Sequence, residues 1–194
     1  MASTKWIYLT SASGDGVVEL HQQVVDWLEE NPTVKLSFNP GTHQMHLGKE
    51  KLLPLLQRTS ALFLNREEAA RVLGITTTDV PELVRAYHDL GVEMLIITDG
   101  PDGSYVSDGK IIWYLPIFNG PVIERTGAGD SYGSGFMGAI LSGKSLDEAL
   151  LWGNANSTSV VRFIGAREGL LDPAGIAKII SENGDLRPKE FHSL

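Results

Sequence analysis

The sequence predicts an α/β domain: a three-layer αβα sandwich around a mainly parallel sheet. Apolar runs of strand length alternate with amphipathic helical stretches along the 194 residues, the pattern of a parallel sheet covered by helices. The run at residues 94–98 is apolar almost without interruption, which indicates a strand buried on both faces. The chain also contains 21 glycines, in keeping with tight loops, and is long enough for a single domain over residues 1–194.

The first half of the chain is expected to alternate strands and helices. Strands are predicted at residues 5–10, 34–38, 61–64 and 94–98, and helices at residues 17–29, 49–57, 66–73 and 81–90. In the first helix, periodicity predicts one apolar face made by Val17, Leu20, Val24, Val25 and Leu28. Pro54 is expected to shorten or kink the second helix. Gly74 and Gly91 are expected to end the next two helices.

The second half is expected to contain a hairpin and then three helices. The hairpin pairs residues 104–107 with 110–115 around Asp108-Gly109. The helices are predicted at residues 130–141, 146–163 and 174–180. Polar or small residues follow several strands, at Asn39, Asn65, Thr98 and the 124–130 segment, so they are expected to converge on one rim of the sheet.

Composition excludes several classes of function. The net charge is -8 with no long basic run, so no nucleic-acid partner is expected. The chain has no cysteine, which excludes disulfides and thiolate metal sites and favours a reducing compartment. No apolar stretch approaches the roughly 20 residues of a membrane span, and no signal peptide is recognisable. We therefore expect a cytoplasmic protein without a membrane partner.

The segment Gly127-Ala128-Gly129-Asp130 is the most informative motif in the chain. A helix start offers unpaired backbone N–H groups and partial positive charge, and small residues let an anion approach them closely. A carboxylate beside that anion suits a base that removes a proton from a hydroxyl. The alternative is a glycine-rich turn that only starts a helix, with Asp130 as its cap.

A second motif places Asn65 three residues before Glu68, directly after a predicted strand. Both side chains then lie at the rim, where Glu68 is expected to reach Mg²⁺ through water. The alternative is an ordinary capping box, in which Asn65 and Glu68 satisfy each other's backbone N–H groups.

Two weaker features complete the pattern. The glycine-rich turn containing Thr98, Gly100 and Gly103 follows a buried strand and is suited to lie along a nucleotide. Asn154 is a polar residue within a long predicted helix, where it is as compatible with an exposed position as with a ligand-facing one.

Together and in this order, the motifs resemble those of the ribokinase-like sugar kinases, the PfkB family, from near residue 5 to about residue 182. The resemblance implies a ribokinase-like fold and ATP-dependent phosphoryl transfer to a sugar hydroxyl, with Mg²⁺. It implies Asp130 as catalytic base, Gly127, Ala128 and Gly129 as anion hole, and Glu68 as the magnesium residue. It implies cofactor-binding roles for Asn39, Asn65, Thr98, Gly100, Gly103 and Asn154.

Two local departures from the family pattern concern the residues around the anion hole. Glu124 and Arg125 stand where relatives carry Asp-Thr, and because that Asp helps bind a monovalent cation in many of them, these residues disfavour a potassium site. Tyr132 replaces the common Phe, a mild change.

The largest departure is at the N-terminus. Family chains begin with a further region that supplies the first strand, the sugar-gripping residues and a small β lid, and no such motif is recognisable here. We therefore expect a truncated member that binds nucleotide and a small sugar or sugar phosphate, with impaired phosphorylation. An uncovered sheet edge and apolar surface favour a homodimer or higher homo-oligomer.

Two other functions stay open on the sequence alone. One is a phosphosugar isomerase of aldose–ketose or Amadori type, with Asp130 as acid and base and residues 127–129 holding the substrate phosphate. The other is a non-catalytic nucleotide-binding remnant. Only the kinase requires ATP to form product.

Overall fold

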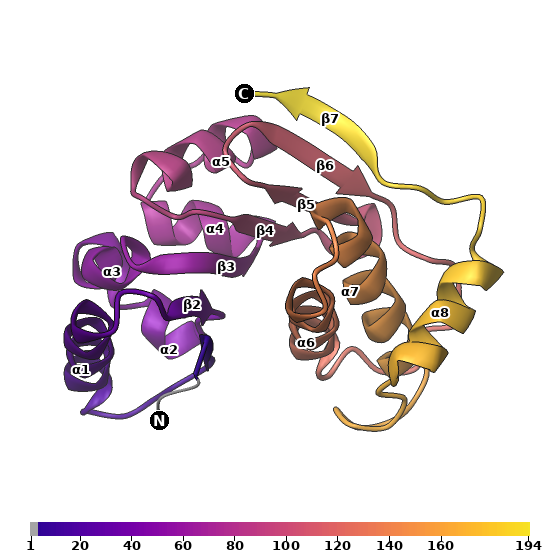
Figure 1. Ribbon diagram of the computed structural model, residues 1–194, viewed down its shortest axis with the longest axis horizontal. Coiled ribbons are helices and arrows are strands. Elements are labelled where there is room, and N and C mark those ends of the chain that lie inside the picture. Colours follow the sequence, from indigo (N-terminus) through magenta and orange to yellow (C-terminus); the bar gives the residue numbers. More distant parts are fainter. Residues whose placement is uncertain (1–3) are drawn as a thin grey trace. The chain divides into compact units, whose positions relative to one another are not determined.

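The computed structural model describes residues 4–194, which form two compact units (Figure 1). The first unit runs to Ile97 and includes Ser107–Lys110 and Leu194. The second consists of Thr98–Val106 and Ile111–Ser193. No helix among residues 4–194 has the length and apolar character needed to cross a membrane.

The first unit is built on the parallel strands that the sequence predicts. Its strands, in the order in which they lie side by side, are β1 (Trp6–Leu9), β2 (Lys35–Phe38), β3 (Thr59–Asn65) and β4 (Leu95–Thr98). β1 pairs in parallel with β2, and β2 with β3, where the register shifts between Leu36 and Ser37. All β3 residues except Asn65 are buried, as are the first three of β4, so this sheet forms the core of the unit.

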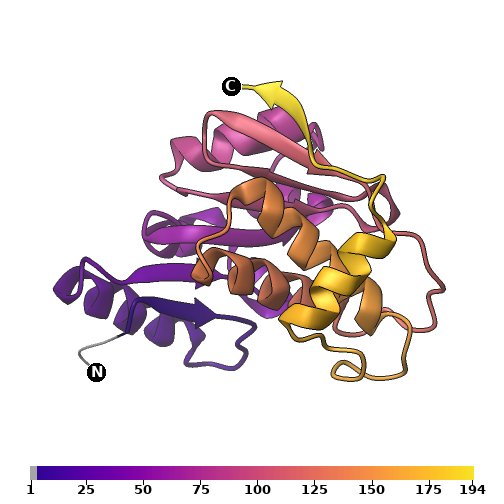
Figure 2. The same ribbon diagram turned by 45° about the vertical axis from the view of Figure 1, so that its right-hand side comes forward.

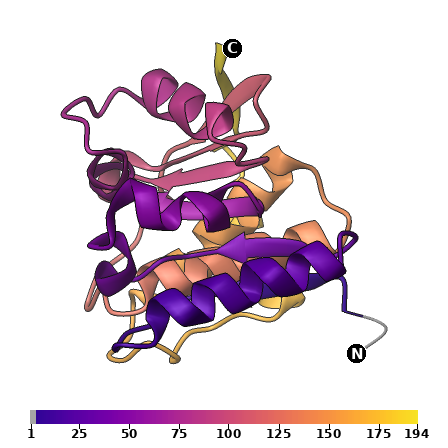
Figure 3. The same ribbon diagram turned by 90° about the vertical axis from the view of Figure 1, so that its left-hand side faces the viewer.

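Five helices belong to this unit. They are α1 (Val17–Glu30), α2 (Thr42–Met45), α3 (Gly48–Leu56), α4 (Arg66–Leu73) and α5 (Val80–Asp89). Figure 3 shows α1 lying along the β1–β2 strands. The bounds of α4 and the left-handed Gly74 that ends it agree with the sequence prediction. α2 is not predicted from the sequence. α3 continues through the exposed Pro54 to Leu56, so Pro54 does not shorten it.

The buried face of α1 differs from the predicted one. Val17, Val25 and Leu28 are buried as expected, but Leu20 is 38% exposed and His21 is buried in its place. Residues 17, 21, 25 and 28 follow the helical spacing more closely than a stripe through residue 20. Hydrophobicity alone misplaced the face because the side chain at position 21 is polar.

The second unit contains the predicted hairpin and helices, together with one unpredicted strand. Its elements are the 3₁₀ turn Gly100–Asp102, β5 (Ser104–Ser107), β6 (Ile111–Leu115), α6 (Ala128–Leu141), α7 (Leu146–Val160), α8 (Pro173–Glu182) and β7 (Lys189–Ser193). β7 pairs antiparallel with β6, and its Phe191 ring lies 5.1 Å from that of Tyr105. α6 begins two residues earlier than predicted, and α7 ends three residues earlier.

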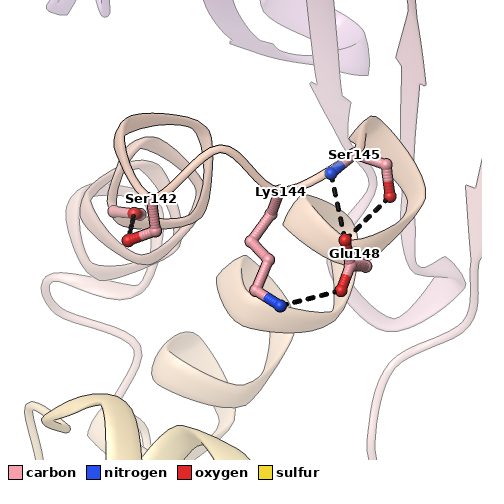
Figure 4. Close-up of polar contacts among 5 residues, drawn as sticks. Ser142, Lys144, Ser145 and Glu148 are labelled. Atoms are coloured by element: carbon pink, nitrogen blue, oxygen red, sulfur yellow. Dashed lines mark hydrogen bonds and ion pairs between the residues drawn. The ribbon is translucent and has the colours of Figure 1, made fainter.

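α6 and α7 lie side by side (Figure 2). They pack closely because glycines line their contact. A Cβ on Gly135 would lie 2.7 Å from the carbonyl oxygen of Trp152, and one on Gly153 would lie 2.9 Å from the Tyr132 ring. α7 starts with a capping box: Glu148 Oε2 accepts from the backbone N–H and the hydroxyl of Ser145 (Figure 4). Lys144 donates to the other oxygen at 3.0 Å.

A buried hydrogen-bond network joins the loops that follow β1 and β2 in the first unit. Gln44 Oε1 accepts from the N–H of Ala12 at 3.0 Å and from the N–H of Gly41 at 2.9 Å. This leaves the Gln44 amide nitrogen as donor to His21 Nε2, at 2.9 Å. His21 is therefore held neutral with its proton on Nδ1, and burial lowers its pKa below the usual value.

This network predicts a pH dependence of stability. The unfolded chain, with an ordinary histidine pKa near 6.5, binds a proton on His21 that the folded chain takes up only at lower pH. The free energy of unfolding should thus fall as the pH drops from about 6.5 through the lowered pKa, by at most about 1.4 kcal/mol per pH unit. Urea unfolding between pH 8 and 5 measures this slope. His21→Leu should flatten it, the exposed His43→Gln should not, and equal slopes in wild type and His21→Leu would contradict the assignment.

Candidate functional site

The second unit contains two adjoining cavities that share a wall. The first has a volume of about 130 Å³ and is lined by Thr98, Gly100, Gly103, Ser104, Ile117, Ala128, Gly129, Tyr132, Asn154 and Ser157. The second has a volume of about 200 Å³ and is more apolar; it shares Gly100, Ile117, Ala128, Asn154 and Ser157 and adds Pro101, Phe118, Gly120, Pro121, Val122, Arg125, Thr158 and Val161. Of the predicted site residues, Thr98, Gly100, Gly103, Ala128, Gly129 and Asn154 line the hollow that the two cavities form, whereas Gly127 and Asp130 are not among its lining residues.

The first turn of α6 forms one end of this hollow. Gly127 precedes the helix with a left-handed φ of 79°, and a Cβ there would lie 2.8 Å from Ala166. The N–H of Ala128 donates to the backbone carbonyl of Arg125 at 3.1 Å. The N–H groups in the first turn of a helix have no acceptor within the helix. Asp130 is exposed in that first turn, so it lies within the helix rather than capping it. The helix start thus combines N–H donors, a positive dipole end and a carboxylate.

Gly129 differs from Gly127 because the fold does not require it. Its φ is in the ordinary range, and a Cβ added there would meet no atom within 4 Å. Glycine inside a helix is destabilising relative to alanine. Gly129 is thus required neither by the backbone conformation nor by packing, and it lines the first cavity.

The turn after β4 also lines the hollow, through Thr98, Gly100 and Gly103. The N–H of Asp99 donates to the Gly103 carbonyl at 2.8 Å, which closes the turn. Gly103 has a φ of 98°, and a Cβ on it would lie 2.3 Å from the Leu115 carbonyl oxygen. This glycine is therefore required by the fold, and it brings backbone rather than side chains to the cavity surface.

Asn154 is 5% exposed, so the sequence-based possibility of a surface position is wrong. Its amide nitrogen donates to the Pro116 carbonyl at 2.7 Å. Its amide oxygen accepts from the Phe118 N–H at 3.4 Å and from the Thr158 hydroxyl at 3.3 Å. The side chain lines both cavities, but its hydrogen bonds hold the 116–118 segment that forms the cavity wall.

Three predicted site residues belong to the first unit. Asn39 donates to the Tyr8 hydroxyl at 3.3 Å. Asn65 and Glu68 form a complete capping box: Asn65 Oδ1 accepts from the Glu68 N–H, and Glu68 Oε2 accepts from the Asn65 N–H, both at 2.8 Å. Their capping role, left open by the sequence, is present. Within residues 4–194 no group of three or more His, Asp or Glu side chains is arranged to hold a metal.

Sequence reasoning missed two contributions to the hollow. One is the 117–122 segment, whose Ile117, Phe118, Pro121 and Val122 make the second cavity apolar. Its apolar run was the available signal. The other is the hydroxyl of Tyr132, which donates to Ser104 at 2.9 Å beneath the first cavity. Burial raises the pKa of this phenol, so the hydroxyl stays protonated.

Comparison with known proteins identifies the family. The model of the pfkB family carbohydrate kinases matches residues 10–173. The chain belongs to this family. A nucleoside kinase from Methanocaldococcus jannaschii is 35% identical over 138 residues, covering 70% of this chain and 43% of that protein.

Solved structures show the α/β ribokinase fold that the sequence predicts. Arabidopsis thaliana ribokinase complexed with ribose and ATP matches with a TM-score of 0.72 and 25% identity, over 84% of this chain and 52% of that one. A ribokinase II candidate from E. coli, in complex with ATP and Mg²⁺, matches with a TM-score of 0.82 and 18% identity, over 92% and 59%. The chain therefore spans roughly half the length of the relatives it matches.

The contrast between the two glycines gives a direct test of the site. Gly129→Ala should be as stable as the wild type or up to about 1 kcal/mol more stable, because alanine suits a helix better. Gly127→Ala should cost about 1–3 kcal/mol for its left-handed backbone, before any cost of the clash with Ala166. Urea unfolding of both variants measures the difference. If Gly129→Ala were destabilised as much as Gly127→Ala, the fold would require Gly129, and this glycine would not support a ligand site at the start of α6.

Proposed function

We propose that the chain binds ATP in the second unit and transfers its terminal phosphoryl group to a hydroxyl of a sugar or nucleoside. The observation that carries this proposal is the structurally unneeded Gly129 on the cavity wall at the start of α6, next to the exposed Asp130. Family membership and the ATP complexes of relatives support it.

The two cavities suit the two ends of a nucleotide. The apolar cavity, with Ile117 and Val122 in its walls, accommodates a flat base, and its position beside α6 directs the phosphates toward the helix start. There the backbone N–H groups and the helix dipole stabilise negative charge. The same groups stabilise the charge of the transferring phosphoryl group, which is the main catalytic requirement of this reaction.

Asp130 is the proposed base. As an exposed carboxylate in the first turn of α6, it accepts the proton of the attacking hydroxyl while the N–H groups hold the phosphate. A carboxylate of ordinary basicity does not ionise a free alcohol, so its role is to take the proton as the new bond forms. Positioning of the acceptor beside it supplies the rest of the rate.

Mg²⁺ is the proposed ion partner of the ATP phosphates. It binds proteins through one or two carboxylates, water and substrate phosphates rather than through a cage of side chains. Glu68 and Asn65, at the start of α4, are proposed to support it, with Asn39 near the phosphates. A single carboxylate together with phosphate oxygens agrees with the absence of a three-residue metal cluster among residues 4–194. The ion would neutralise charge on the phosphates.

The proposed acceptor is a ribose-type hydroxyl, free or within a nucleoside. The relatives above are a nucleoside kinase and a ribokinase bound to ribose. The proposed location is the cytoplasm, because ATP chemistry and a chain without cysteine suit a reducing compartment.

The test compares the wild type with Asp130→Asn on a panel of sugars, nucleosides and sugar phosphates, each with and without Mg-ATP. We expect ATP-dependent phosphorylated product in the wild type and a loss of at least about 100-fold in Asp130→Asn, the typical contribution of a general base. Asp147→Asn, a half-buried first-turn carboxylate of α7, is the control and should leave the rate unchanged.

Other outcomes would overturn the proposal. Asp130-dependent conversion of a sugar phosphate without ATP would assign the site to an isomerase. Saturable ATP binding without any product would assign it to a nucleotide-binding protein.

We also propose that the chain self-associates through β1. In the described part of the chain β1 pairs with β2 alone, and its Tyr8 side chain is 40% exposed. Unpaired strand edges readily pair with another chain. Light scattering at micromolar concentration should give at least twice the 21.1 kDa mass of one chain, and Tyr8→Lys should shift the mass toward the monomer. A monomeric wild type would refute this proposal and leave the kinase proposal standing.

A further inference from the structure

Glu124 makes a bridge between the anion loop and a distant turn. One carboxylate oxygen accepts from the hydroxyl of Thr126 at 2.5 Å, within the loop. The other accepts from the backbone N–H of Gly165 at 2.9 Å, 41 residues away in the sequence. The bridge formed by Glu124, Thr126 and Gly165 therefore uses both oxygens of the carboxylate.

Two further contacts join the same segments. The N–H groups of Ile123 and Glu124 both donate to the carbonyl of Val161 at the end of α7, at 2.8 and 3.2 Å. Gly127 lies directly against Ala166, where even a single added carbon would come within 2.8 Å. The loop that precedes α6 is thus attached at both ends to the 161–166 segment, and Glu124 supplies a side-chain link between them.

Charge makes this link stronger than an ordinary hydrogen bond. Bonds to an ionised carboxylate are shorter and stronger than neutral ones. The bond from Thr126 and the bond from Gly165 both lower the pKa of Glu124, so the group stays ionised at neutral pH. The negative charge of Glu124 repels a phosphate rather than attracting it. The carboxylate therefore contributes to the proposed site by holding the loop.

We propose that Glu124 is a positioning residue: its carboxylate fixes the anion loop against the 165–166 turn and so keeps the start of α6 in place for phosphate binding. The inference rests on the proposed nucleotide site. In this arrangement the chain's own Thr126 and Gly165 donors bind the carboxylate, which gives the loop an internal attachment.

The experiment measures binding of ADP and of adenosine by calorimetry, in choline chloride, for wild type, Glu124→Ala and Glu124→Gln. ADP binding depends on both the proposed phosphate site and the base cavity, whereas adenosine, which has no phosphate, measures binding in the base cavity alone. Glu124→Ala should weaken ADP binding at least about tenfold, as loss of two charge-assisted bonds suggests, and leave adenosine binding within about twofold. Glu124→Gln keeps an oxygen for the Gly165 N–H and an amide for the Thr126 hydroxyl, and should recover most of the affinity. Glu168→Ala, an exposed carboxylate in the same turn, is the matched control.

Hydrogen exchange of the ligand-free proteins tests the bridge independently of any ligand. Peptides covering residues 122–128 and 163–167 should exchange faster in Glu124→Ala than in wild type or Glu168→Ala. Unchanged exchange would overturn the positioning role even if affinity fell. A wild type that fails to bind ADP would instead refute the proposed nucleotide site, because the exchange result does not depend on it.

Discussion

Gly127 lies against Ala166 with a left-handed backbone, and α6 begins where it does because no side chain stands between them. The position of that helix start determines where the first-turn N–H donors and Asp130 lie. The close packing of α6 on α7 through Gly135 and Gly153 then fixes the direction of the helix. A site whose chemistry depends on backbone groups needs this backbone precision, because no rotamer change can correct a misplaced N–H.

Local signals made much of the fold predictable. α4 was predicted correctly because its start is a reciprocal capping box and its end a left-handed glycine, both written in a few adjacent residues. β7 was missed because Lys189–Ser193 carries almost no apolar pattern; it forms by pairing with β6 and by the packing of Phe191 on Tyr105. The buried face of α1 was misjudged because His21 enters the core through a partner, Gln44, that lies 23 residues further along the chain.

In the candidate site, too, some features are predictable from adjacent residues and others depend on residues far away in the chain. The glycine-rich segments were visible in the sequence because glycine is uncommon inside a helix and at a closed turn unless geometry demands it. The roles of individual polar groups were not visible, since they depend on partners far away in the chain. Asn154 illustrates this: its membership of the hollow was predictable from the motif pattern, but its bonds to Pro116 and Phe118 are not encoded near residue 154.

The way Asn154 holds the cavity wall has a consequence for how this protein can change. The wall is attached to α7 by backbone atoms of residues 116 and 118, while Ile117 and Val122 present their side chains to the hollow. In the proposed function, substitutions at those two wall positions would alter the shape offered to a base without touching α6 and α7. Preference for one nucleoside triphosphate over another would then be free to drift, or to be engineered, separately from the proposed phosphoryl transfer.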